Sequence, residues 1–145
     1  MIPIGIANDH SGYHLKIQLI AFLKNRLKYK KILNFGTNTG KAVDYPDYAH
    51  HVANAIGDKK IDLGILICGS GIGMSICANR HKYVRAALCN DVKFAKLARE
   101  HNNANILVLA GRYISFRKAS HILEIFLYSK FQLGRHITRI KKISL

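Results

Sequence analysis

The side chain best suited to proton transfer is Cys68. It ends an apolar run and precedes a loop with glycine at three positions, Gly69, Gly71 and Gly73. Glycine lets the backbone approach a ligand closely, and the amides at the start of a following helix can hold an anion. A thiol beside such amides tends to have a lowered pKa, and its thiolate can act as a base or a nucleophile. The pattern predicts a catalytic Cys68, with a buried structural cysteine as the alternative.

The same loop argues against a nucleotide cofactor. Met74 stands where the dinucleotide-binding fingerprint GxGxxG has its last glycine, and the Gly-Lys-Ser/Thr of a P-loop is absent from this segment.

Asp9 and His10 place a carboxylate and an imidazole side by side after the first apolar run. This arrangement suits proton transfer and phosphate contact. Asp9 could instead cap a helix, and His10 and His14 could be surface residues or two metal ligands. Because no third ligand follows at a recognisable metal-binding spacing, no metal site is predicted.

Two further groups of polar residues come late in the chain. His101 and Asn102 stand before the last apolar run, where an imidazole could serve as a general acid or the pair could form a polar helix end. Arg135 and Arg139 would share one helix face, and two guanidinium groups can clamp a phosphate. The alternative for the arginines is a solvated basic tail.

Short β-branched runs alternate with helical patterns along the chain, which is typical of a parallel sheet covered by helices on both faces. We therefore expect an α/β fold with three layers and a five-stranded parallel sheet. The strands are predicted at roughly residues 2–7, 32–35, 63–68, 85–88 and 106–110. Pro3 must then lie at a strand start or at an edge.

Helices are predicted between these strands. Leu15, Leu19 and Leu27 recur at helical spacing, with Ser11 as the expected N-cap. Later helices are predicted over residues 46–57, 72–81, 92–100 and 115–128, and a short basic helix or tail from Gly134 onward.

Parallel strands bring their carboxyl ends to one edge of a sheet, where ligands bind. The segments that begin at Asp9, Cys68 and Gly111 each follow a predicted strand. We expect them to meet at this edge.

Length and composition narrow the possibilities further. The 145 residues suit one domain over 1–145. No apolar stretch approaches the roughly 20 residues that cross a bilayer, and the start lacks a signal-peptide pattern, so we expect a cytoplasmic protein. Three cysteines without an even disulfide set fit a reducing compartment, and Cys77 and Cys89 are interpreted as structural.

The charge leaves a second class of function open. Lys and Arg outnumber Asp and Glu by 23 to 8, for a formal charge of +15. Such a field attracts polyanions, so a basic nucleic-acid-binding module is an alternative. The sequence lacks zinc-finger spacing, an aromatic ladder and an RNA-binding strand motif. Solvated helix faces explain the charge as well, and a basic surface also suits phosphorylated substrates.

Taken in order, these motifs resemble the family of type B ribose 5-phosphate isomerases and galactose 6-phosphate isomerases, over nearly the whole chain. The matching pieces are Asp9-His10 with Gly12, residues 43–49 (VDYPDYA), residues 68–73 (CGSGIG), residues 99–102 (REHN) with Asn105, Gly111-Arg112, and the pair Arg135 and Arg139. The family uses either a cysteine before the glycine loop or a glutamate after it as the base, and Cys68 matches the first type.

The resemblance implies a Rossmann-like domain that needs no cofactor and interconverts ribose 5-phosphate and ribulose 5-phosphate in the pentose phosphate pathway. The resemblance further implies that His101 would protonate the ring oxygen and that Asp9 would take the proton of the anomeric hydroxyl. Cys68 would then move a proton between C2 and C1, while Ser70 and the loop amides hold a cis-enediolate. The residues implied to contact the sugar or its phosphate are His10, Tyr45, Gly69, Gly71, Ile72, Gly73, Asn102, Arg112, Arg135 and Arg139.

The resemblance also implies a homodimer or tetramer with shared active sites. Residues 134–145 would pack on the partner subunit and carry Arg135 and Arg139 to its site. The sugar stays open at this point, because isomerases of allose or galactose 6-phosphate share these motifs. Asn8 and Ser11 differ from the small residues expected beside Asp9-His10.

Overall fold

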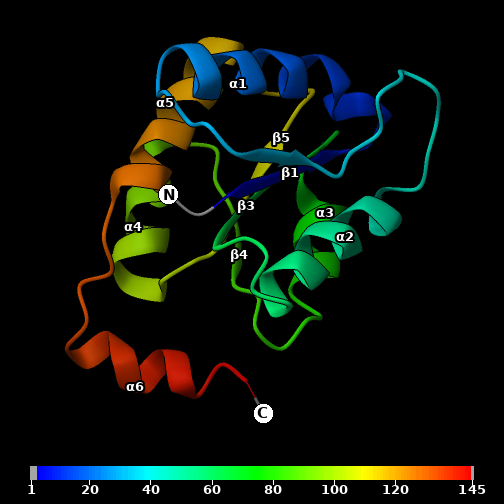
Figure 1. The fold of residues 1–145 in the computed structure, drawn as a ribbon. Coiled ribbons are helices and arrows are strands. Elements are labelled where there is room, and N and C mark those ends of the chain that lie inside the picture. Colours follow the sequence, from blue (N-terminus) through cyan, green and yellow to red (C-terminus); the bar gives the residue numbers. More distant parts are fainter. Residues whose placement is uncertain (1–2, 145) are drawn as a thin grey trace.

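A computed structural model describes residues 3–144 and contains a sheet of five parallel strands. The strands are β1 (Ile4–Asn8), β2 (Ile32–Asn34), β3 (Leu63–Cys68), β4 (Ala86–Leu88) and β5 (Ile106–Ala110). They lie in the order β2-β1-β3-β5-β4 (Figure 1). The expected α/β fold with a five-stranded parallel sheet is confirmed.

Helices cover both faces of this sheet (Figure 1). One face carries α1 (Tyr13–Asn25), α4 (Val92–Asn102) and α5 (Phe116–Tyr128), and the other carries α2 (Tyr45–Gly57) and α3 (Ile72–Ala78). The predicted three-layer arrangement is therefore present.

Successive residues of β3 enter different layers, because side chains alternate across a strand. Ile65 and Ile67 pack among the apolar side chains of α1, α4 and α5. Leu66 and Cys68 pack with α2 and α3. Burial on both faces explains why the strand is continuously apolar, and it places the Cys68 sulfur on the side of α3 and the glycine loop.

The strand order reverses between β1 and β3. After β1 the chain adds β2 on one side and then crosses to form β3 on the other. Asn8 is paired with Ile67, and Cys68 is paired with Ala110, so the segments after β1, β3 and β5 leave the same edge side by side. The expected meeting of the three motifs at the carboxyl edge is confirmed.

The starts of two elements differ from the sequence prediction. A short 3-10 helix, η1 (His10–Gly12), precedes α1, and Gly12 rather than Ser11 is the N-cap of α1. The Asp9 carboxylate takes the capping role instead, at η1. β1 begins directly after Pro3 as expected, whereas Ile2 lies outside the described residues.

The observed ends of several strands and helices also differ from the predicted ones. β2 ends at Asn34, β4 begins at Ala86, and α3 ends at Ala78. α4 runs on to Asn102, so His101 lies within its last turn rather than after it.

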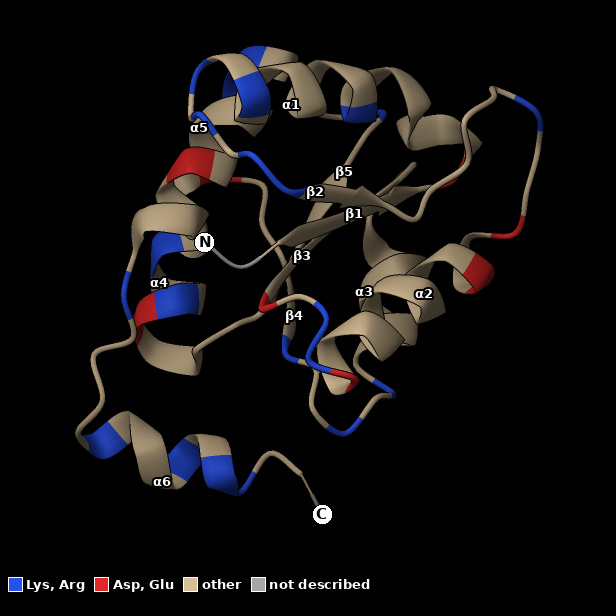
Figure 2. Ribbon diagram, viewed as in Figure 1, with Lys and Arg blue, Asp and Glu red and all other residues tan. Residues whose placement is uncertain are grey.

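α6 (Arg135–Lys141) lies apart from the sheet, beyond an extended segment that follows α5 (Figure 1). It packs on the end of α4, and the amide of Gln132 donates to the carbonyl of Glu100 at 3.0 Å. Figure 2 shows Lys and Arg along α6 and in the loops after α1, α2 and α3. Over residues 3–144, no helix has the length and apolar character to span a membrane.

Candidate active site

A cavity of about 330 Å³ opens at the carboxyl edge of the sheet. It is lined by Asp9, His10, Ser11, Tyr45, Cys68, Gly69, Ser70, Gly73, Arg112 and Tyr113. The fold thus brings together eight of the residues expected from the sequence, and Gly71 and Ile72 complete the same loop. Ser11 and Tyr113 were not predicted, although each is adjacent in the chain to a predicted residue.

Cys68 lines this cavity and is 4 % exposed. Burial raises the pKa of its thiol and the Asp9 carboxylate adds to the shift, whereas the backbone amides of Met74, Gly71 and Ser70 act in the opposite direction. The expected lowering of the pKa is wrong, because the loss of solvation of the thiolate outweighs the amides. Cys68 is therefore mainly a thiol at neutral pH.

Asp9 and His10 are both held by backbone amides. The Oδ1 atom of Asp9 accepts hydrogen bonds from the amides of Ser11 at 2.9 Å and Gly12 at 3.2 Å. Both bonds end on one oxygen, so Oδ2 can face a ligand. The Nδ1 atom of His10 lies 3.2 Å from the amide of Val43 and accepts its hydrogen. An acceptor at Nδ1 places the proton of a neutral imidazole on Nε2, from which it can be donated to a phosphate oxygen.

The glycine loop needs its glycines for two different reasons. Gly71 has φ of +76°, a left-handed conformation, and a Cβ there would collide with Leu88. Gly73 lies against the ring of Tyr45, whose Cζ would be 2.5 Å from an added Cβ. The Ser70 hydroxyl accepts a hydrogen bond from the amide of Ile72 at 3.2 Å. These contacts turn the loop sharply into α3 and keep its backbone open to a small ligand.

Arg112 brings a positive charge to the cavity. Its side chain passes over Gly69, at 3.5 Å from the position of an added Cβ, and its amide donates to the Gly69 carbonyl at 3.1 Å. The cavity thus combines a buried thiol, a carboxylate, an imidazole and a guanidinium group beside the glycine loop.

The buried Lys16 supports this site, and its role was not predicted from the sequence. It is 1 % exposed, and its Nζ donates to the carbonyl of Thr37 at 2.5 Å and to Oδ1 of Asn38 at 3.0 Å. Burial lowers the pKa of Lys16. The lysine anchors the segment between β2 and α2, which carries the Val43 amide to His10. Its spacing from Leu19 and Leu23 places it on the buried face of α1 and is the signal that could have revealed it.

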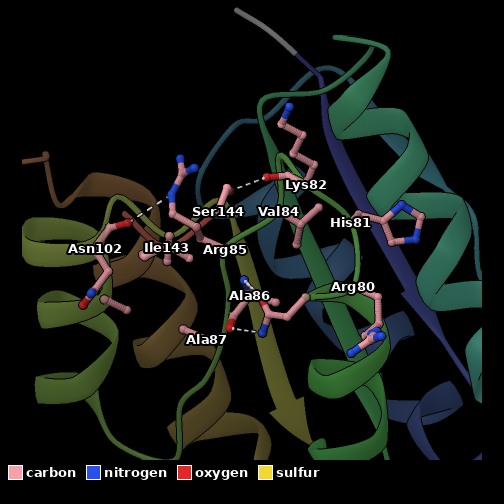
Figure 3. Close-up of a pocket in the computed structure, with 13 residues that line it drawn as sticks. Arg80, His81, Lys82, Val84, Arg85, Ala86, Ala87, Asn102, Ile143 and Ser144 are labelled. Carbon is pink, nitrogen blue, oxygen red and sulfur yellow. Dashed lines mark hydrogen bonds between the residues drawn. The ribbon is translucent and has the colours of Figure 1, made fainter. Parts of the chain in front are cut away.

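Four expected site residues lie elsewhere in the same chain. His101 stacks on His136 of α6, with ring centroids 4.4 Å apart. Asn102 lines a different cavity of about 760 Å³ beside the C-terminal segment (Figure 3). Arg135 and Arg139 are exposed on α6.

The direction of α4 accounts for this separation. α4 connects β4 to the parallel strand β5, so it runs opposite to the strands and ends at their amino edge. Cys68 lies at the carboxyl edge. A single chain therefore does not bring the last turn of α4 to its own cavity.

The other two cysteines are buried, as expected. The Cys77 sulfur lies 3.4 Å from Nε2 of His50, whose Nδ1 is 2.7 Å from Nε2 of His81. Burial raises the pKa of Cys89 to about 11. Among the side chains of residues 3–144, no three His, Cys, Asp or Glu are grouped as metal ligands would be.

Comparison with known proteins finds relatives that match nearly the whole chain. The family model described as Ribose/Galactose Isomerase matches residues 4–143. Ribose-5-phosphate isomerase B of Escherichia coli is 36% identical over 144 residues, which cover 99% of this chain and 95% of that protein. A Rickettsia conorii protein, provisionally named a sugar phosphate isomerase, is 49% identical over 140 residues, covering 97% and 96% of the two chains.

Solved structures show the same fold. The ribose 5-phosphate isomerase of Thermotoga maritima superimposes with a TM-score of 0.95 at 46% identity, over 99% of this chain and 97% of that one. Ribose-5-phosphate isomerase B of Mycoplasma genitalium, solved with bound ribulose-5-phosphate, gives 0.91 at 42% identity, over 98% and 93% of the chains. The Rossmann-like architecture and the expected resemblance are both confirmed. The chain belongs to the ribose/galactose isomerase family.

Proposed function

We propose that this protein interconverts ribose 5-phosphate and ribulose 5-phosphate. The observation that carries the proposal is the position of Cys68, next to Asp9 and the amides of the glycine loop in a cavity of small-molecule size. A base beside hydrogen-bond donors is what proton transfer through an enediolate needs, because negative charge develops on oxygen in the transition state.

The reaction begins with opening of the furanose ring. Asp9 accepts the proton of the anomeric hydroxyl while His101 donates a proton to the ring oxygen, and the C1–O bond to the ring breaks to give the open aldehyde. The Cys68 thiolate then removes the proton from C2, which leaves a cis-enediolate. The amides of residues 69–73 and the Ser70 hydroxyl stabilise its oxygen charge. The proton on O2 passes to O1, and return of the proton from Cys68 to C1 then gives the ketose with its carbonyl at C2.

The substrate phosphate lies with His10, Arg135 and Arg139, while Tyr45 and Arg112 contact the sugar or its phosphate end. His101, Asn102 and the two arginines are away from the cavity of their own chain. We therefore infer a symmetric homodimer in which the last turn of α4 and α6 of each subunit complete the cavity of the other. The segment 134–145 then forms part of the dimer interface rather than a separate domain, and a cytoplasmic location fits the three free thiols.

A six-carbon aldose 6-phosphate is the second substrate class, because the matching family model covers both ribose and galactose isomerases. The relatives named for ribose 5-phosphate favour the five-carbon sugar. Family membership likewise favours an enzyme over a basic nucleic-acid-binding module.

A coupled assay tests the proposal. Purified protein is offered ribose 5-phosphate, allose 6-phosphate and galactose 6-phosphate in separate reactions containing EDTA. We expect turnover to be fastest with ribose 5-phosphate and unaffected by the chelator. Faster turnover of a six-carbon sugar would select the second substrate class, and no turnover of any sugar phosphate would refute the proposed function.

A further inference from the structure

Hydrogen bonds from two arginines hold the last turn of α4, which carries His101 and Asn102. The Nε atom of Arg85 donates to the carbonyl oxygens of Asn102 at 3.1 Å and Asn103 at 3.0 Å, and Figure 3 shows the first of these bonds. The Nη1 atom of Arg99 donates to the carbonyl of Ala104 at 2.6 Å and to Oδ1 of Asn103 at 3.3 Å. Carbonyls at a helix end have no partner within the helix, so these bonds satisfy acceptors that would otherwise be unpaired.

The charges of this pair have no counter-ion within residues 3–144. The salt bridges found there join Lys60 to Asp58 and Lys96 to Glu100, and neither arginine takes part. Burial lowers the pKa of both guanidinium groups, and the positive charge of Arg85 lowers that of Arg99 further. Two half-buried cations that repel each other cost free energy unless nearby acceptors compensate, and the negative end of the α4 dipole supplies this compensation.

The backbone around the two arginines leaves the helix end little freedom. Asn103 has φ of +44° and forms the left-handed C-cap of α4. The side chain of Asn105 accepts from the amide of Arg85 at 2.8 Å and donates to the carbonyl of Tyr83 at 2.8 Å. Hydrogen bonds in both directions therefore join the segment before β4 to the end of α4.

We propose that Arg85 and Arg99 are positioning residues for the isomerisation: they fix the last turn of α4 and thereby orient His101 and Asn102 toward the cavity of the partner subunit. This inference rests on the proposed function, in which His101 is the general acid of ring opening. The arginines act through His101, so their loss should affect the steps that need His101 and spare those that need only Cys68.

Two reactions separate these steps. Conversion of ribose 5-phosphate requires ring opening, whereas exchange of the C1 hydrogen of ribulose 5-phosphate with D₂O requires proton transfer by Cys68 but no ring. Arg85→Met keeps the aliphatic stem and removes the donors and the charge. We expect it to slow conversion by about tenfold or more while C1 exchange stays within about threefold of wild type. Equal losses in both reactions would overturn the proposal.

A double-mutant cycle and a matched control sharpen this result. In a His101→Asn background, Arg85→Met should lower the rate of ribose 5-phosphate conversion almost no further, because its effect passes through His101. Arg80→Met is the control. Arg80 is exposed on the wall of the cavity of about 760 Å³ that Asn102 also lines, away from the active-site cavity (Figure 3), so its replacement should leave both reactions unchanged. A full additional loss in the His101→Asn background, or an equal loss in Arg80→Met, contradicts the positioning role.

Hydrogen exchange of the backbone gives a reading that needs no substrate. Arg85→Met should accelerate amide exchange in peptides covering residues 99–105, whereas Arg80→Met should not. Unchanged protection in Arg85→Met would overturn the proposal whether or not the protein is an isomerase. If the wild type turns over no sugar phosphate but Arg85→Met loses protection as expected, the proposed function is wrong, while Arg85 is still shown to fix the last turn of α4.

Discussion

At Cys68 two opposing effects act on one sulfur atom. Burial and the Asp9 carboxylate disfavour the thiolate, while the amides of the glycine loop favour it, and burial has the larger effect. A thiolate that forms despite this is a strong base, because basicity rises with pKa. In the proposed reaction the rate therefore depends on the fraction of Cys68 that has lost its proton.

The pH dependence of proton transfer by Cys68 follows from this shift. Only the deprotonated thiol can remove the proton from C1 or C2, and a rising pH increases its fraction. We expect the rate of C1 hydrogen exchange of ribulose 5-phosphate, which needs Cys68 but no proton from His101, to increase from neutral pH into the alkaline range and to level off only above the ordinary pKa of a cysteine. Rates measured between about pH 6 and pH 10 at constant ionic strength check this. A plateau already reached below neutral pH would show that the thiolate forms more readily than its burial allows.

Replacement of Cys68 by alanine tests its role as the base. Because Cys68→Ala removes a single sulfur atom, the fold should survive, while turnover should fall by about 100- to 10,000-fold as is typical for a lost general base. Steady-state kinetics and thermal unfolding measure the two effects. Cys89→Ala is the matched control, since Cys89 is equally buried but lies outside the cavity. Near-normal turnover in folded Cys68→Ala would assign the base to another residue.

At the scale of elements, the site depends on how a strand passes into a helix. β3 ends at Cys68, and α3 begins at Ile72, so the whole turn consists of Gly69, Ser70 and Gly71. Such a short connection requires the left-handed conformation of Gly71, whose amide interacts with the Cys68 sulfur. Catalytic geometry and loop stability are therefore coupled in this segment.

Gly71→Ala should consequently lower both the stability of the protein and its turnover. Alanine is strained at φ of +76°, and its Cβ would collide with the side chain of Leu88. We expect a loss of about 1–3 kcal/mol in the free energy of unfolding, together with slower turnover. Gly57→Ala is the control, because no atom lies within 4 Å of an added Cβ at the end of α2. Urea unfolding of the two variants decides the matter, and equal stability of both would contradict the strain argument.

At the scale of the whole molecule, the proposed reaction needs groups from both ends of the sheet. Cys68 lies at the carboxyl edge, while His101 ends α4 at the amino edge and α6 extends beyond it (Figure 1). Within one chain the length of the sheet separates Cys68 from His101, whereas two chains related by a two-fold axis can each present an α4 end to the cavity of the other.

Subunit mixing tests this shared site. Homodimers of Cys68→Ala lack the base, and homodimers of Arg135→Ala/Arg139→Ala bind phosphate weakly, so both should be nearly inactive. After exchange at equal concentrations half of the dimers are mixed, and one of the two sites in each mixed dimer is intact. Activity should therefore return to about a quarter of wild type if the sites are independent. Analytical ultracentrifugation of the wild type should show a dimer. Verified exchange without any gain over the two parents would place the arginines in the site of their own chain or in none.

Much of this organisation could be predicted from the sequence, because it depends on spacing over a few residues. The apolar runs at 63–68 and 106–110 have a composition that suits strands buried on both faces, and both are strands in the structure. Parallel strands bring their carboxyl ends to one edge, so the convergence of Asp9, Cys68 and Arg112 followed from the order of elements alone. Helix ends departed further from the prediction. Gly12 caps α1 without a side-chain hydrogen bond, and Asn103 ends α4 through its left-handed backbone and its backbone amide, which the residue type alone does not dictate.

Other properties were decided only by the tertiary structure. The pKa of Cys68 rises because strands and helices distant in the chain exclude water from it, and a motif does not reveal that burial. His101 lies away from the cavity of its own chain because α4 runs opposite to the strands, which depends on chain direction and not on residue type. Arg85 and Arg99 meet at the end of α4 only when β4 is placed beside β5. Each of these outcomes is set by distances between segments far apart in sequence, and such distances exist only after the sheet and its two helical layers have assembled.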